Sequence, residues 1–534
     1  MESIKPLIDK VAATIAATNT SLLPQAAAVV GTVLAILITG RVLHAFFLSP
    51  LRRIPGPLLA RLTSKRGDLD NFSGKVCQTA ERDGERYGEV YVYKPNAVCI
   101  SHPDDVRAVL GSTEFRKASF FDIFDDGDTK NIVSQRDPAL AGRRRRQIGP
   151  YLNFQYLHRM EHVIQRHGYE AIRGKWERLL EENDGRPVEV NYRIDTQLAT
   201  FDIMSALAFG RDPSSISKGS SSISSRAGSI MDLLDSPLIL GLLSLIPFTW
   251  LMLPWKWMYQ ELAEYSHESS RMRRELLDKL KTTGSPAPAD MLQAFLEAED
   301  PESKVKMTPS EIQAECIMMM LAGSETTSSA IMWVFHLLLL HPDKLRRAVD
   351  EVRGAGFAPD HLISHREILA RLPYIDAVVS EALRVSPTTA GLTPRISHTR
   401  GIELHGGHYV PPGTEIFVNL RSVNMHESLW DEPRRFKPER FLGEHGEAAR
   451  KTLFTFSYGP RNCIGRNLAW VEMLTIVANT LKDFDLKLPP GSLFGPDNVD
   501  EEGLPRLLPA KCFIASFPAN PDRDCRMIIT RRKD

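Results

Sequence analysis

Residues 456–465 read F-S-Y-G-P-R-N-C-I-G, and this stretch decides how the rest of the sequence is interpreted. Two glycines, a proline and an arginine surround Cys463, a composition that predicts a tight loop with exposed backbone N–H groups. Residues 466–481 then carry apolar side chains at helical spacing, so Cys463 is expected just before or at a helix N-terminus. The helix dipole and unpaired amides there favour a thiolate, because they lower a thiol pKa that is ordinarily near ~8.5.

A thiolate on a glycine-turned loop can ligate iron, whereas most free cysteines are buried structural residues. By average residue usage, the pattern F-x-x-G-x-R-x-C-x-G should arise by chance in only about one in ten thousand chains of this length. The stretch resembles the haem-binding signature of the cytochrome P-450 superfamily, the haem-thiolate monooxygenases. The resemblance implies that Cys463 is the axial ligand of the iron of haem b, that Arg461 binds a haem propionate, and that Phe456 packs beside the sulfur.

Composition excludes several other classes of protein. Lys and Arg together number 66, as do Asp and Glu, so no global charge recruits nucleic acid. The six cysteines are scattered without C-x-x-C spacing, which argues against a zinc site and against the disulfide framework of a secreted protein. A reducing compartment fits this cysteine usage best.

The N-terminal region is expected to be a membrane anchor. Residues 11–40 carry no charge, and residues 22–40 approach the ~20 apolar residues that span a bilayer. A cleaved signal peptide is the rival interpretation, but it needs an apolar core nearer the start and a small-residue cleavage site. Basic residues are denser after the apolar stretch, which places the bulk of the chain in the cytosol. We therefore expect an anchor at 1–49, a proline-rich and basic hinge at 50–66 and a catalytic domain at 67–534. The layout resembles single-pass microsomal members of the family in the endoplasmic reticulum.

A long helix is predicted from the capping box at Thr308 to Glu311, with proline at its first position, as far as His341. Its middle reads A-G-S-E-T-T at 322–327, where a glycine and an acid are costly in a helix interior. One explanation of the hexapeptide is structural: the glycine allows close helix packing and the acid has a hydrogen-bonding partner. The hexapeptide also resembles the family's oxygen-binding groove. That resemblance implies that Ala322 and Gly323 make room for O2, that Thr326 hydrogen-bonds the distal oxygen, and that Glu325 passes protons inward through water.

A second motif is predicted to brace the cysteine loop. Glu381 and Arg384 lie three residues apart in the predicted helix at 372–387 and so share one face, which is ordinarily a surface salt bridge. The pair resembles the family's E-x-x-R, which joins the arginine of a later P-E-R-F, here Arg440. The resemblance implies a buried structural network that does not touch substrate.

Two further arginines are expected at the haem by resemblance. In the family, an aromatic residue or histidine and an arginine four positions later contact a propionate. Arg145 matches the arginine, but Ala141 stands in the place of the aromatic, and the choice among the four residues 143–146 stays open. Arg395 corresponds to an arginine that clamps the second propionate.

Extended segments are predicted at 87–102, at 408–419, and at 512–517 with 527–530, the last two as a terminal hairpin. Residues 195–210 are expected to be helical and the serine-rich residues 213–225 an exposed loop. Residues 236–255 carry no charge, but three prolines break them. We interpret this segment as a membrane-dipping lid over the substrate cavity rather than a second span.

The expected fold class is mainly α with small β sheets, the cytochrome P-450 fold preceded by a transmembrane helix. The expected function is insertion of one atom of O2 into a lipophilic small molecule, such as a fungal terpenoid or polyketide. The electrons would come from NADPH through a membrane-bound reductase, and the membrane lipid is a further partner. Two alternatives are a haem-thiolate isomerase or dehydratase without a reductase, and a haem sensor or electron carrier. A carrier has no need of the acid and threonine at 325 and 326.

Overall fold

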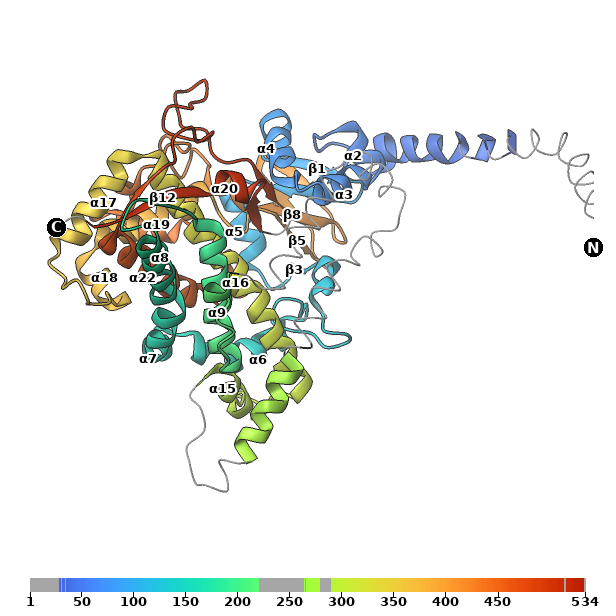
Figure 1. Cartoon of the computed structure of the whole chain (residues 1–534). Coiled ribbons are helices and arrows are strands. Elements are labelled where there is room, and N and C mark those ends of the chain that lie inside the picture. The colour runs from blue at the N-terminus through green and yellow to red at the C-terminus, as the bar shows by residue number, and fades with distance from the viewer. Residues whose placement is uncertain are drawn as a thin grey trace, which may run out of the picture.

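The computed structural model describes residues 28–29, 31–33, 35–219, 264, 266–278, 290–512 and 515–532. This part of the chain is mostly helical with small sheets, as expected (Figure 1). The predicted lid at 236–255 lies outside the described residues. Of the predicted loop at 213–225, the described part contains a short helix, α10 (Ser215–Lys218).

The longer helices supply most of the core. They are α4 (Val76–Tyr87), α6 (Pro138–Ile148), α7 (Phe154–Gln165), α8 (Ala171–Glu182), α9 (Tyr192–Phe209), α16 (Pro309–Leu340), α17 (Pro342–Gly354), α19 (Pro373–Val385) and α22 (Arg466–Asp483). The shorter ones are α2 (Leu58–Leu62), α3 (Lys65–Phe72), α5 (Pro103–Gly111), α15 (Met291–Glu297), α18 (His365–Arg371), α20 (Leu420–Asn424), α21 (Gly446–Lys451) and α23 (Pro521–Asp524). Single turns include η2 (Ser119–Phe124), η5 (His405–Gly407), η6 (Pro438–Phe441) and η7 (Gly459–Arg461).

Helix α16 is the centre of the helical region, and both of its predicted ends are confirmed. Thr308 caps it in a reciprocal capping box with Glu311, and the helix stops at His341. Its buried face packs against α9, α19 and α22, so the helix crosses the main hydrophobic core. Helix α9 also ends as predicted, at Gly210, whose φ of +65° suits a residue without a side chain.

The largest sheet has five strands in the order β1-β2-β8-β5-β3. These strands are β1 (Val90–Lys94), β2 (Ala97–Ile100), β8 (Glu415–Asn419), β5 (Leu392–Ile396) and β3 (Arg116–Lys117). The predicted hairpin at 87–102 is therefore confirmed as β1 and β2. The two extended runs at 408–419 are also strands, but they do not pair with each other. Strand β7 (His408–Val410) pairs with β6 (Ile402–Leu404), whereas β8 lies between β2 and β5.

The predicted terminal hairpin is wrong in its pairing. Residues 512–517 were expected to be one strand, but Cys512 ends β10 (Ala510–Cys512) and Ser516 begins β11 (Ser516–Pro518), and these two strands pair with each other. Strand β12 (Arg526–Arg531) instead lies between β4 (Val188–Asn191) and β9 (Phe484–Lys487). The physical reason is burial: Met527 and Ile529, on alternate positions of β12, are both 0% exposed and belong to the main helical core.

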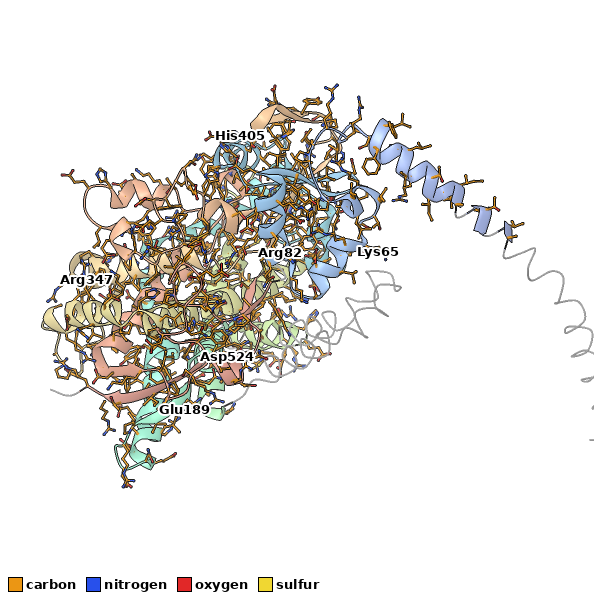
Figure 2. All side chains as sticks on the ribbon, turned by 90° about the horizontal axis from the view of Figure 1, so that it is seen from above. Lys65, Arg82, Glu189, Arg347, His405 and Asp524 are labelled. Atoms are coloured by element: carbon orange, nitrogen blue, oxygen red, sulfur yellow. A yellow bond between two sulfur atoms is a disulfide. The ribbon has the colours of Figure 1, made fainter. Side chains whose placement is uncertain are left out.

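An apolar helix leads into the domain, and residues Gly31–Leu48 are long and apolar enough to cross a membrane, with a mean hydropathy of 1.8. Only 6% of this window is buried, and in Figure 2 the helix stands apart from the rest of the molecule. The predicted hinge at 50–66 is packed onto the sheet. Leu51 and Ile54 are buried beside β1, and the Val92 N–H donates to the Pro55 carbonyl at 2.8 Å.

One disulfide is present in the described residues. It joins Cys77 in α4 to Cys512 in β10, with the two Cα atoms 6.0 Å apart. The cysteine spacing gave no sign of this pair, because 435 residues separate its members. Cys463 is among the free cysteines and is accessible to solvent.

Candidate active site

The cysteine loop has the geometry that its composition predicts. Cys463 lies between η7 and the first residue of α22, whose N-cap is Gly465. The Cys463 N–H donates to the Phe456 carbonyl at 2.8 Å and closes the loop. Gly459 has a φ of +71°, and a Cβ there would lie 2.3 Å from the Leu110 carbonyl of α5. Only glycine therefore fits at this position, which lets α5 support the loop.

The electrostatic surroundings of Cys463 differ in part from the expectation. Although part of the Cys463 side chain is reached by solvent, desolvation by the surrounding protein raises the thiol pKa. This effect outweighs the backbone N–H of Gly465 and the cations Arg145, Lys117 and Arg466, which lower the pKa. The helix terminus alone thus does not make the free thiol acidic. A coordinated metal ion deprotonates a thiol outright, so these groups would stabilise the sulfur once it is bound to iron.

Phe456 contributes to the loop through both its backbone and its ring. The ring stands edge-on to Trp470 of α22 at 5.5 Å, and the Arg466 guanidinium lies 5.9 Å from its centroid. Trp470 was not singled out from the sequence, where it is simply one of the apolar positions of the predicted helix.

Among the four arginines of α6, Arg145 is the one that faces the cysteine loop. Its guanidinium donates to the Asn462 carbonyl at 2.8 Å and to the Asn462 side-chain oxygen at 2.6 Å. Its neighbours are engaged elsewhere: Arg144 contacts Glu311 and Glu315, and Arg146 binds Asp300. The acidic partners of these neighbours are far away in the sequence. The run of four arginines alone therefore could not show which arginine faces the cysteine loop.

Arg145 belongs to a group that we call the cation cluster, namely Lys117, Arg145, Arg395 and Arg461. Lys117 on β3 stands directly opposite Arg395 on β5. Both lie over the ring of Phe121, Lys117 at 4.6 Å and Arg395 at 5.7 Å from its centroid. Like charges directly opposite each other on paired strands are destabilising. The sheet therefore holds two like charges close together, with Arg395 buried and Lys117 partly buried.

No carboxylate offsets this charge in the described part of the chain. Lys117 donates to the Val133 carbonyl at 2.7 Å, Arg461 to the Ile132 and Gln135 carbonyls, and Arg395 to the Pro394 carbonyl. Burial holds the pKa of Lys117 well below its usual value, and the nearby arginines lower it further. Burial, with help from the neighbouring cations, also lowers the pKa of Arg395 to about 9 and that of Arg461 to about 10.

Buried charges in proteins are ordinarily paired, so the cation cluster calls for an anionic partner. A group that carries two carboxylates next to the Cys463 sulfur satisfies this requirement, and the two propionates of haem b fit it. Lys117 is the member that the sequence did not reveal. One indirect sign of a further contact was present in the sequence. Alanine at position 141 replaces the aromatic residue or histidine that contacts a propionate in the family, so that contact had no residue assigned to it.

The hexapeptide of α16 is arranged differently from the expectation. Gly323 faces α9: a Cβ there would lie 2.6 Å from the Met204 sulfur, so its missing side chain lets the two helices pack closely. Thr326 donates its hydroxyl to the Ala322 carbonyl at 2.6 Å. The Glu325 carboxylate binds Arg193 of α9 at 2.8 Å and accepts a bond from Gln197. The acid thus points toward α9 in this structure.

The structure brings Glu381, Arg384 and Arg440 together. Glu381 and Arg384 are both 0% exposed and form a two-bond pair at 2.7 and 2.8 Å, and the Arg440 Nε lies 3.3 Å from the same carboxylate. Arg384 also donates to the Asn424 carbonyl. The Asn424 side chain in turn holds the residues that lead into the cysteine loop, Phe454 and Thr455.

Comparisons with known proteins agree with this geometry. The family model for cytochrome P450 matches residues 54–506. Among the relatives, the cytochrome P450 monooxygenases helB1 and helB2 of Aspergillus fumigatus are 66% and 48% identical. The helB1 match covers 93% of this chain and 84% of the relative, and the helB2 match covers 92% and 96%. The cytochrome P450 monooxygenase atr2 of Stereocaulon alpinum is 29% identical over 86% of this chain and 90% of its own length. The chain therefore belongs to the cytochrome P450 family and is an enzyme of its monooxygenase class.

Proposed function

We propose that the protein inserts one atom of O2 into a lipophilic small molecule and that it draws electrons from NADPH through a reductase. One observation carries the proposal: an accessible cysteine at a helix start lies beside four cations, Arg395 buried and the other three partly buried, that have no carboxylate partner in the described residues. Haem b supplies the iron that activates O2 when bound. The protein supplies its ligand, its orientation and the proton path.

Each cofactor-facing residue has a distinct part in the proposal. Cys463 ligates the iron, while the amide of Gly465 and the nearby cations stabilise the anionic sulfur. Arg145, Arg395, Arg461 and Lys117 hold the propionates, and charge-assisted bonds of this kind are worth about 1.5–3 kcal/mol each. Glu381, Arg384 and Arg440 remain at a distance and keep the loop in place.

Thr326 and Glu325 remain the proposed residues for hydrogen bonding to O2 and for proton transfer. The Thr326 hydroxyl donates to the Ala322 carbonyl, which leaves its oxygen lone pairs to accept a bond from water. Arg193 and Gln197 hold the Glu325 carboxylate near one end of such a path, and the side chain must turn from them to deliver a proton inward. Ala322 is exposed beside Thr326 and leaves room for a small ligand.

The apolar helix at Gly31–Leu48 supports a membrane location, for which we propose the endoplasmic reticulum with the catalytic domain in the cytosol. Lipophilic substrates dissolve in that membrane. The similarity to fungal monooxygenases supports a secondary metabolite, such as a terpenoid or polyketide, as the substrate class.

The ligand assignment is tested by the difference spectrum of the reduced protein with carbon monoxide. A Soret band typical of thiolate-ligated haem is expected in the wild type and not in Cys463→Ala. Thr326→Ala is expected to retain the band while it consumes more O2 per product formed. A histidine-type band in the wild type would remove the ligand assignment.

A second measurement separates monooxygenation from haem-dependent isomerisation or dehydration. With substrate and reductase present, NADPH consumption should match product formation, and the product should contain one oxygen atom from labelled O2. Product formation without NADPH would favour the reductase-independent alternative.

A further inference from the structure

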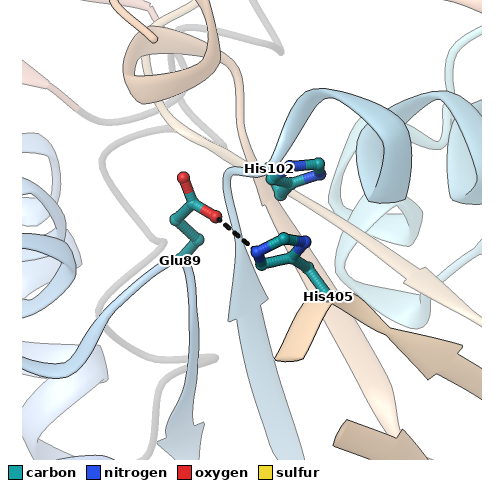
Figure 3. A group of neighbouring side chains, drawn as sticks. All are labelled: Glu89, His102 and His405. Atoms are coloured by element: carbon teal, nitrogen blue, oxygen red, sulfur yellow. Dashed lines mark ion pairs between the residues drawn. The ribbon is translucent and has the colours of Figure 1, made fainter. Parts of the chain in front are cut away.

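Four polar side chains outside the candidate active site meet at one place, and we call them the histidine cluster: Glu89, His102, His405 and His426. Glu89 precedes β1, His102 caps α5, His405 opens η5 and His426 follows α20. Figure 3 shows Glu89, His102 and His405. One potential ligand atom from each of these three lies within 4.8 Å of the others.

The Glu89 carboxylate directs its two oxygens at two different histidines. Oε1 contacts His426 Nε2, and Oε2 lies 3.8 Å from His405 Nε2. His426 Nδ1 accepts the Ser428 backbone N–H at 3.1 Å, so a neutral His426 ring carries its proton on Nε2 and donates it to Glu89. His426 therefore orients Glu89 and leaves Oε2 for another partner.

His102 and His405 provide two imidazoles at the same place. Their rings are stacked, with centroids 4.0 Å apart and planes 8° from parallel. The lone pairs of stacked rings point in parallel directions, so joint coordination requires one ring to turn. The His405 side chain is 58% exposed and can turn, while its backbone N–H stays anchored to the Asp105 carboxylate at 3.0 Å. If His102 coordinates through Nδ1, it loses one hydrogen bond, the 3.3 Å bond that Nδ1 accepts from the Asp104 N–H.

We propose that Glu89, His102 and His405 bind a zinc-type divalent cation, with water as the fourth ligand and His426 as the positioning residue. Two imidazole nitrogens and one carboxylate oxygen form a donor set that suits Zn²⁺ and its neighbours in the first transition row. Mg²⁺ and Ca²⁺ prefer an all-oxygen set and do not fit. The proposal does not depend on the haem chemistry, because none of these residues belongs to the candidate active site.

The test uses full-length, haem-loaded protein without a histidine tag, titrated with Zn²⁺ by calorimetry. One ion per chain is expected, with an excess of Mg²⁺ unable to compete. His405→Ala and Glu89→Gln remove a ligand each and should weaken binding about 10-fold or more, and His426→Ala should act in the same direction. His408→Ala, on the same hairpin but outside the histidine cluster, is the matched control and should bind as the wild type does.

X-ray absorption at the zinc edge gives an independent readout, since the haem iron does not contribute there. Two imidazole nitrogens in the shell are expected. Equal affinity in the wild type and in both His405→Ala and Glu89→Gln would overturn the proposal, as would displacement of Zn²⁺ by Mg²⁺. Loss of affinity in His408→Ala equal to that in His405→Ala would also overturn it.

Discussion

Replacing Lys117 by methionine is expected to weaken haem binding and, in the haem-free protein, to raise stability. The two effects have opposite signs because the partly buried ammonium group lacks an anionic partner in the described residues and gains one only from the cofactor. Without haem, Lys117 has one carbonyl bond, at 2.7 Å, and faces the Arg395 charge across the sheet. Replacing buried charges by apolar groups of similar volume often stabilises a protein, by about 1–4 kcal/mol.

With haem bound, the same substitution removes one charge-assisted hydrogen bond. Such a bond contributes about 1.5–3 kcal/mol. At about 1.4 kcal/mol per factor of ten, the haem dissociation constant should rise roughly 10- to 100-fold. The loss is measured as the rate of haem transfer to excess apomyoglobin, followed through the Soret band, and haem-free stability is measured by urea unfolding.

Two control variants make this result specific. Lys117→Arg keeps the charge and should retain most of the haem affinity. Lys451→Met, on α21 with a 73% exposed side chain, should change neither quantity. The reasoning is refuted if Lys117→Met releases haem at the wild-type rate, or if it destabilises the haem-free protein, because Lys117 would then be an ordinary packing residue.

Three other substitutions test the packing and electrostatics around the site. Burial raises the Glu315 pKa from 4.5 to about 7, so its protonated form stabilises the fold below pH 4.5 and that stability is lost as the pH rises to about 7. The free energy of unfolding of Glu315→Gln, measured in urea, should therefore rise relative to that of the wild type between pH 5 and pH 8, by up to about 3 kcal/mol. A difference that stays constant with pH would contradict this. Glu381→Ala leaves a buried arginine unpaired and should cost about 3–5 kcal/mol in urea unfolding, so an unchanged midpoint would show that the network is dispensable. Gly323→Ala should cost about 1–3 kcal/mol by overpacking against Met204, and Met204→Ala in the same chain should recover part of it. Additive effects of these two changes would argue that Gly323 serves another purpose.

Much of the local structure could be predicted because it depends on neighbouring residues. The capping box at Thr308, the C-cap at Gly210 and the loop that ends at Cys463 each involve a few consecutive residues whose backbone preferences are known. The pair Glu381 and Arg384 could be placed on one face for the same reason. The E-x-x-R network needed the family resemblance to find its third member, Arg440, which is distant in the sequence.

The pairing of strands and the direction of side chains on α16 could not be predicted in this way. Gly323 and Glu325 were assigned roles in oxygen binding and proton delivery by resemblance, and nothing in the sequence indicated that they also meet Met204 and Arg193 of α9. The register of β3 with β5 likewise decides that Lys117 meets Arg395. Such contacts depend on packing between distant elements, which the spacing within one element does not record.

The local sequence is enough to place a cysteine on a glycine-turned loop at the start of a helix, since turn and cap preferences act over a few residues. The charges that surround this cysteine follow instead from the packing of distant elements. Residues 117, 145, 395 and 461 come from β3, α6, β5 and η7, and they converge because the sheet and helices pack around a shared core. The free energy of that packing is a property of the whole chain, which is why no single motif could reveal it.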